Sequence, residues 1–215
     1  MRVLLAICIY LSALICGHAA GFTKVPEQID PDCRHGSARI YDECTDQLLL
    51  FEIAMQRAAK EGKVVLVSYG AEWCIWCHVL NAYLGGEKTK FDYVYADPGE
   101  PDEIYEATLY ERENRDVSAE AAELNTFVRD HFIVLHIDYF FAPNGDRVLE
   151  NSGALDHLGD GIPFVFVVNA SGKFRAVVDA DLAETRRDED FDWYRGYDRT
   201  RLLSSLKKAY QAALQ

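Results

Sequence analysis

The spacing of hydrophobic residues predicts a helix followed by a buried strand in the first half of the chain. Leu50, Ile53 and Ala54 recur on one face of a helix predicted over 45–60. The run 64–69 is short, rich in β-branched residues and apolar on both faces. That pattern is typical of a central strand covered by helices on both sides.

The same patterns continue along the chain and predict an α/β architecture. Residues 144–146 are expected to form a turn and residues 179–192 a loop. The remaining elements are helices over 74–84, 124–131 and 199–214, and strands over 132–137, 164–168 and 174–178, the last two forming a hairpin. This order favours a central mixed sheet flanked by helices.

Residues 85–122 differ from the rest in composition. Ten acidic residues lie between Asp97 and Glu123, with only Arg112 and Arg115 as counter-charges. We interpret this segment as an acidic helical insertion with one or two solvated helices. As an alternative to a purely solvated face, the acidic patch could select a basic partner.

The N-terminal residues have the features of a targeting segment. One positive charge at Arg2 precedes a short apolar run, and small residues follow at Ala19 and Ala20. This predicts a signal peptide over 1–20, with an uncleaved anchor as the alternative. Residues 21–44 show no periodicity and form an N-terminal arm, and residues 45–215 form the main domain.

Composition narrows the class of partner. The chain has 215 residues, of which 49% are hydrophobic, so a packed globular core is expected. There are 35 acidic and 22 basic residues, giving a formal net charge of −13. That charge disfavours nucleic acid and anionic lipid as partners, and no stable membrane insertion is expected after signal cleavage.

The cysteines indicate the compartment. Export to a periplasmic or extracellular location would place the four cysteines that remain after signal cleavage in an oxidising environment. Three pairings are possible. Proximity favours Cys74 with Cys77, and Cys33 with Cys44 as a structural disulfide. Free thiols, or part of a metal site at Cys33 and Cys44, are the alternatives.

The most informative motif is Trp73-Cys74-Ile75-Trp76-Cys77-His78, directly after a predicted buried strand. At the first turn of a helix, the Cys74 sulfur would face unpaired N–H groups and the positive end of the helix dipole, which stabilise a thiolate. Cys77, one turn later, would be the buried resolving cysteine. His78 could lower the thiol pKa further, or could only cap or solvate the helix.

The same motif has three alternative interpretations: a haem attachment site, a zinc site and a structural disulfide. Cys-x-x-Cys-His also attaches c-type haem, but the one methionine outside the signal, Met55, fits the core better than an axial position. A zinc site lacks a second cysteine pair at ligand spacing. A purely structural disulfide would close very little chain. No cofactor and no metal are therefore expected.

The residues from Lys60 to Cys77 resemble the thioredoxin superfamily, and are closest to exported members with a Trp-Cys-x-Trp-Cys pattern. Gly161-Ile162-Pro163-Phe164 resembles the family's second mark, a cis-proline loop facing the dithiol. The resemblance covers 45–84 and 124–214. It implies a thioredoxin-like three-layer sandwich.

The resemblance also implies roles for individual residues. Cys74 would attack a disulfide and Cys77 would release the mixed disulfide. The backbone at Ile162, next to the cis bond of Pro163, would pair with the substrate, and Trp73 and Trp76 would form an apolar rim.

Four residues, at three places in the chain, depart from the family pattern. Ser68 stands where many members keep a buried acid, Ile75-Trp76 replaces the usual Gly-Pro, and Phe164 replaces a common threonine. Rate, redox potential and substrate preference therefore do not transfer.

The sequence therefore predicts an exported thiol–disulfide oxidoreductase acting on protein cysteines. Its partners would be proteins with thiols or disulfides and a redox protein that donates or accepts electrons. The direction, reductase or oxidase/isomerase, is left open. The alternative is a binding or chaperone-like module with structural cysteines, whose acidic insertion recognises a partner.

Overall fold

A computed structural model describes residues 21–88, 92–97, 100–108, 116–180, 184–186 and 195–215. The predicted signal peptide at 1–20 lies outside these residues. No helix in the described part of the chain is long and apolar enough to span a bilayer.

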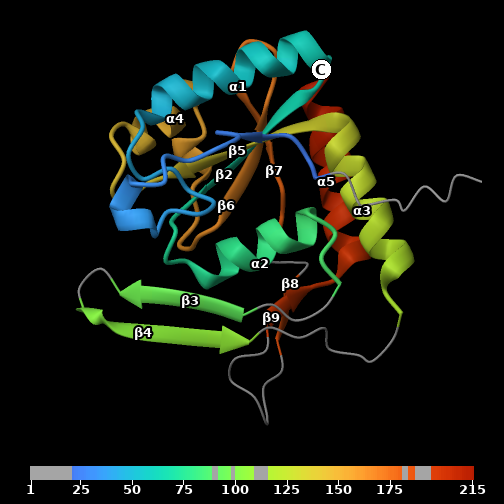
Figure 1. Ribbon diagram of the computed structural model, residues 1–215. Helices are drawn as coiled ribbons and strands as arrows, with labels where there is room; N and C mark the ends of the chain where they lie inside the picture. The colour runs from blue at the N-terminus through green and yellow to red at the C-terminus, as the bar shows by residue number, and fades with distance from the viewer. Residues whose placement is uncertain (1–20, 89–91, 98–99, 109–115, 181–183, 187–194) are drawn as a thin grey trace, which may run out of the picture.

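A five-stranded mixed sheet forms the centre of the molecule (Figure 1). Its strands, in spatial order, are β1 (Lys24–Val25), β5 (Phe132–Asp138), β2 (Val64–Gly70), β6 (Phe164–Val168) and β7 (Phe174–Val177). β1 and β2 run parallel to β5, whereas β6 is antiparallel to β2 and β7 to β6. Every residue of β2, β5 and β6 is buried, as their mainly apolar sequences predict.

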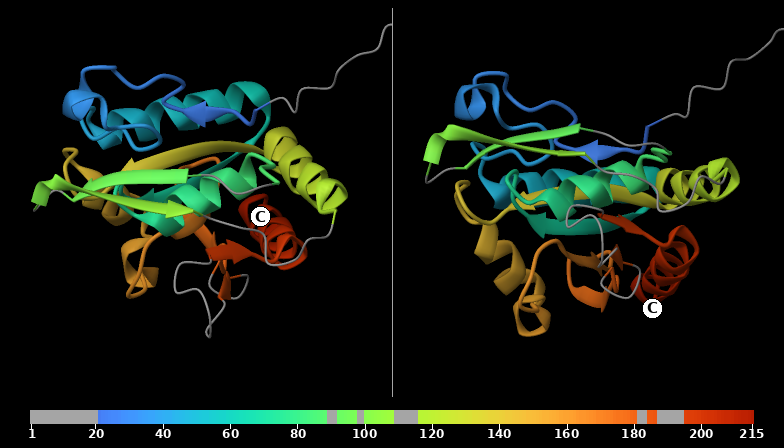
Figure 2. Two further views of the ribbon diagram at one scale, coloured as in Figure 1. Left: turned by 60° about the horizontal axis from the view of Figure 1, so that its bottom comes forward. Right: turned by 90° about the horizontal axis from the view of Figure 1, so that it is seen from below.

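Helices cover both faces of this sheet (Figures 1 and 2). On one face, Val65 and Val67 pack against α1 (Gln47–Glu61) and α4 (Gly145–Ser152). Leu66 and Val134, on the opposite face, pack against α2 (Ile75–Leu84), α3 (Ser118–His131) and α5 (Arg199–Ala213). This layered arrangement confirms the thioredoxin-like fold class.

Local sequence explains where the best-predicted helix begins and ends. The Asp46 side chain caps α1 by accepting a hydrogen bond from the Leu48 amide at 2.9 Å. Gly62 ends the helix with a φ of 66°, a left-handed conformation that glycine adopts without steric cost.

Within the acidic insertion, the described residues 92–97 and 100–108 form a β-hairpin, so the helical prediction for them is wrong. β3 (Asp92–Asp97) and β4 (Glu100–Thr108) pair antiparallel and are drawn in green below α2 in Figure 1. Tyr93, Val94 and Tyr95 on one strand, and Ile104 and Tyr105 on the other, favour extended backbone. These residues outweigh the acidic composition on which the helical prediction relied.

Three other expectations were also wrong. A short strand, β8 (Glu184–Arg186), lies in the predicted loop 179–192 and pairs with β9 (Arg195–Tyr197). The predicted turn at 144–146 is instead the start of α4, with Asn144 in a left-handed conformation (φ 67°) before the first turn. α3 begins at Ser118 rather than at residue 124, so the insertion ends earlier than expected.

The N-terminal arm is ordered and belongs to the sheet. The arm contributes strand β1 to the sheet. The chain then continues through η1 (Cys33–Gly36) and residues 37–46 to the start of α1. A second 3-10 helix, η2 (Leu155–His157), follows α4. No sequence pattern indicates β1, because two residues are too few to show a period.

Candidate active site

The two cysteines of the Cys-x-x-Cys motif lie where strand β2 is followed by helix α2. Cys74 is the N-cap of α2, and its Sγ accepts a hydrogen bond from the Cys77 amide at 3.2 Å. The two residues are joined as a disulfide, with their Cα atoms 5.3 Å apart. Because Cys74 sits at the helix N-terminus, backbone N–H groups and the helix dipole favour a thiolate there once the bond is reduced.

The proline loop before β6 lies against Cys74. The Ile162–Pro163 peptide bond is cis. The carbonyl oxygen of Ile162 is 3.6 Å from the Sγ of Cys74, although 88 residues separate them in the chain. The structure therefore brings together the two motifs that the sequence singled out.

Both cysteines are largely covered. Cys74 is 5% exposed and Cys77 is 1% exposed. Ile40, Trp73, Trp76 and Ile162, all only partly buried, pack around them. A protein substrate can reach the Cys74 sulfur only where these surface side chains give way.

Aromatic side chains extend the surface next to Cys74. Trp73 makes edge contacts with Tyr139 and Phe140, with ring centroids 6.2 and 6.3 Å apart, and Phe140 is 53% exposed. Trp76 contacts Tyr197 at 5.6 Å on the other side. Sequence analysis did not select residues 139 and 140. The signal was available, because they follow β5, whose carboxyl end lies at the same sheet edge as that of β2.

His78 is paired with Glu72. Its Nε2 lies 2.7 Å from the Glu72 carbonyl oxygen and 3.1 Å from Glu72 Oε1. The other carboxylate oxygen of Glu72 accepts the amides of Ile40 and Tyr41 at 2.9 and 3.0 Å. Burial alone would raise the pKa of Glu72, but the interactions with His78 and the two amides together lower it. Glu72 therefore links the turn before Cys74 to the N-terminal arm.

A buried tyrosine from the arm packs directly against the cysteine pair. Tyr41 is 0% exposed and forms one apolar cluster with Cys74 and Cys77. Its hydroxyl is 3.0 Å from the Oγ of Ser68. Sequence analysis missed Tyr41 because the arm shows no pattern that would place any of its residues at the site.

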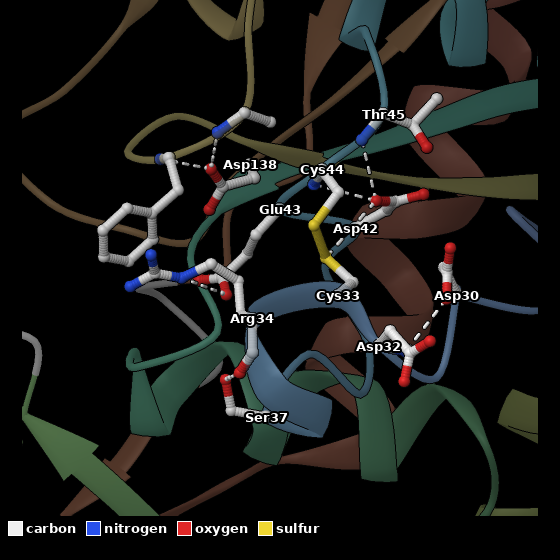
Figure 3. Close-up of a disulfide and its surroundings, with 12 residues drawn as sticks. Asp30, Asp32, Cys33, Arg34, Ser37, Asp42, Glu43, Cys44, Thr45 and Asp138 are labelled. Carbon is white, nitrogen blue, oxygen red and sulfur yellow. Dashed lines mark hydrogen bonds and ion pairs between the residues drawn. A yellow bond between two sulfur atoms is a disulfide. The ribbon is translucent and has the colours of Figure 1, made fainter.

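The arm carries its own disulfide, between Cys33 and Cys44, with Cα atoms 5.9 Å apart (Figure 3). Asp42 lies beside it, and one of its carboxylate oxygens accepts the amides of Cys44 and Thr45 at 3.0 and 2.9 Å. Ligand atoms of Cys33, Asp42 and Cys44 lie close enough to suggest a metal site. Both sulfurs are bonded to each other, however, so neither is a thiolate ligand.

Buried acids lie next to this disulfide. Arg34 pairs with Glu43 at 3.6 Å, as Figure 3 shows. Burial, together with the nearby carboxylates of Asp138 and Glu72, nevertheless raises the pKa of Glu43 to about 7. Asp138, at the end of β5, accepts three successive backbone amides (residues 140–142), yet burial raises its pKa as well.

Comparisons with known proteins found distant structural similarity to a solved protein. No family model matches the chain, and no curated protein matches it. The crystal structure of a disulphide isomerase from Xylella fastidiosa Temecula1 aligns with 79% of this chain and 86% of that chain, at 23% identity and a TM-score of 0.37. So distant a likeness says nothing about activity, and the fold assignment rests on the sheet order and the helix layers.

Proposed function

We propose that this chain is a thiol–disulfide oxidoreductase acting on protein cysteines through Cys74 and Cys77. The observation that carries the proposal is the position of Cys74. It lies at the start of α2, is bonded to Cys77, and its sulfur is 3.6 Å from the Ile162 carbonyl oxygen of the proline loop.

The chemistry follows from that position. In the reduced protein, the Cys74 thiolate attacks a substrate disulfide, forms a mixed disulfide and expels one substrate thiolate. Cys77 then attacks Cys74, re-forming the intramolecular disulfide, and the second substrate sulfur leaves. Two electrons pass from the cysteine pair to the substrate. The reverse sequence oxidises a substrate dithiol, and a second redox protein resets the pair in either direction.

The surface around Cys74 suits an extended polypeptide. The Ile162 backbone lies next to the sulfur, so a substrate segment can pair with this loop as an added strand. Trp73 and Trp76 flank the sulfur as half-buried apolar side chains, and Phe140 extends the apolar surface beyond Trp73. The proposed substrates are therefore cysteine-containing segments with apolar neighbours.

We also propose that the protein works outside the reducing cytosol, in the periplasm or secreted. The charged, apolar and small-residue order of the first twenty residues supports export. The Cys33–Cys44 disulfide supports an oxidising compartment, because such bonds are rare where thiols are kept reduced.

The test compares Cys74→Ser with Cys77→Ser in a disulfide exchange assay on a cysteine-containing peptide. Both variants lose turnover, but for different reasons. Cys77→Ser keeps the attacking sulfur and accumulates a Cys74–peptide mixed disulfide, detectable by mass spectrometry. Cys74→Ser forms no such adduct.

Two results would contradict the proposal. One is wild-type protein whose Cys74–Cys77 pair does not exchange with glutathione. The other is Cys74→Ser with full activity. Either would favour the alternative, a binding module with structural cysteines. The equilibrium potential of the pair then gives the direction: near −270 mV for a reductant and near −120 mV for an oxidant.

A further inference from the structure

The phenol of Tyr41 lies next to the sulfur of Cys77. A Cβ atom placed on Gly70 would be 2.6 Å from the Tyr41 hydroxyl oxygen and 2.7 Å from the Cys77 Sγ. Both atoms therefore lie within 2.7 Å of one point beside Gly70, a point that carries no atom of a side chain only because residue 70 is a glycine. The ring of Tyr41 is fully buried, so water does not compete for its hydroxyl.

We propose that Tyr41, held by Ser68, donates a hydrogen bond to the Cys77 sulfur when the pair is reduced, and so promotes release of the mixed disulfide. This inference rests on the proposed function and adds a positioned donor from the N-terminal arm. The Tyr41 oxygen is 3.0 Å from Ser68 Oγ, and either oxygen can be the donor. If Ser68 donates to Tyr41, the phenolic hydrogen is free to point at Cys77.

Tyr41 acts here as a donor and not as a base. Burial raises the pKa of its hydroxyl above the ordinary value, and the charges of Glu72 and Asp138 add to this effect. The phenol therefore keeps its proton at neutral pH. A neutral O–H group facing a sulfur stabilises the thiolate over the thiol, since only the thiolate is a strong acceptor.

The assisted step is the second half of the exchange. Cys77 gives its proton to solvent, and its thiolate forms a bond to the Cys74 sulfur. The bond between Cys74 and the substrate sulfur breaks, and the substrate sulfur leaves with the electron pair and takes up a proton from solvent. The hydrogen bond from Tyr41 raises the fraction of Cys77 present as thiolate, at some cost in nucleophilicity.

The other ionisable groups around this spot come from three segments. Glu72 and His78 form one pair beside the arm. His136 of β5 lies edge-on to the Tyr41 ring at 5.2 Å, and burial lowers its pKa to about 3, so it is neutral. Asp138 follows on the same strand, and burial raises its pKa. None of these groups is placed between the Tyr41 oxygen and the Cys77 sulfur by any contact of the described residues.

The experiment follows the two halves of the exchange separately. Protein with its Cys74–Cys77 pair reduced and Cys33–Cys44 intact is mixed with an aromatic disulfide that releases a coloured thiol. The first release reports attack by Cys74 and the second reports resolution by Cys77. Both rates are measured against pH for wild type, Tyr41→Phe and, as a matched control, Tyr69→Phe, which loses the hydroxyl that contacts Asp146.

For Tyr41→Phe we expect the pH midpoint of the second release to rise by about one pH unit. Thiolate nucleophilicity increases as basicity increases, with a Brønsted slope of about 0.4–0.5. Resolution should therefore be about threefold slower below the midpoint and about threefold faster above it. The first release should keep its wild-type rate, and Tyr69→Phe should match wild type in both. If Tyr41 only packed against its neighbours, its loss would not make resolution slower below the pH midpoint and faster above it.

Ser68→Ala tests the orienting partner. This variant should raise the pH midpoint of the second release, but by less than Tyr41→Phe does. In a Tyr41→Phe background it should have no further effect, because no phenolic hydroxyl then remains to orient. If wild type gives no first release, the proposed function fails. If wild type gives both releases and Tyr41→Phe leaves the second unchanged at every pH, this inference fails and the proposed function stands.

Discussion

Replacing Glu72 should destabilise the protein more than any surface acid would, because this carboxylate fastens the N-terminal arm to the turn before Cys74. It is 6% exposed and accepts the Ile40 and Tyr41 amides, while its other oxygen faces His78. In Glu72→Ala both amides lose their acceptor. A buried donor without a partner costs about 1–3 kcal/mol.

The Tyr41 amide is buried, whereas the Ile40 amide is only partly so and can recover a bond to water. We therefore expect Glu72→Ala to lose about 2–4 kcal/mol in the free energy of unfolding. Glu72→Gln keeps an oxygen that accepts the two amides but loses the charge and places an NH2 group toward His78, so it should lose less than Glu72→Ala, about 1 kcal/mol. Glu52→Gln, on the exposed side of α1, is the control and should change stability by less than about 0.5 kcal/mol.

The pH dependence gives a second check on Glu72. Its pKa is lowered in the folded protein, so its contribution to stability is present above the ordinary glutamate value of 4.5 and is lost as the pH falls through the folded value. The difference between wild type and Glu72→Gln should shrink over that acidic range.

Urea unfolding followed by circular dichroism, with both disulfides oxidised, measures each difference at pH 7 and below 4.5. Glu72→Ala within 1 kcal/mol of wild type would refute the reasoning, as would equal losses in Ala and Gln variants.

Two more predictions use the same unfolding assay. The pKa of Glu43 is raised to about 7, so wild type should lose stability as the pH rises from 4.5 to about 7. Glu43→Gln should remove that part of the loss. Parallel curves of stability against pH for the two proteins would contradict this. Gly70→Ala would place a methyl group 2.6 Å from the Tyr41 oxygen and 2.7 Å from the Cys77 sulfur, and overpacking of this kind costs about 1–3 kcal/mol. A Gly70→Ala protein as stable as wild type would show that the gap between Tyr41 and Cys77 is wider than described.

The central strands and the helices beside them could be predicted because their signals are local. β2, β5 and β6 are mainly apolar strands, and a central position buried on both faces of the sheet suits such runs. The start of α2 at Cys74 is likewise encoded next to the end of a strand. These elements are enough to imply a three-layer fold.

The β3–β4 hairpin shows where composition misleads. Its acidic residues suggested a solvated helix, whereas the aromatic and β-branched residues between them favour extended backbone, and Tyr95 lies opposite Tyr105 in the register of the two strands. Composition reports how much charge a segment carries. The spacing of its aromatic and β-branched residues determines whether the segment forms a helix or a strand.

The surroundings of the cysteine pair were the least predictable part of the site. Glu72 lies in a predicted turn, yet its carboxylate accepts hydrogen bonds from amides of residues that precede it by more than thirty positions. Tyr41 lies in a segment without periodicity and reaches Ser68, 27 positions later. Such contacts depend on how the arm folds back over the sheet, which no local pattern specifies.

The environments of the two sulfurs come from different parts of the chain. The position of Cys74 at a helix start follows from the motif, so the motif supports the type of reaction. The environment of Cys77 comes instead from the arm, from β2 and from an absent side chain at Gly70. Since the potential of a dithiol depends on how each sulfur is stabilised, proteins that share the motif but lack this arm should not share the potential. The arm is therefore part of the site's chemistry as well as of the fold.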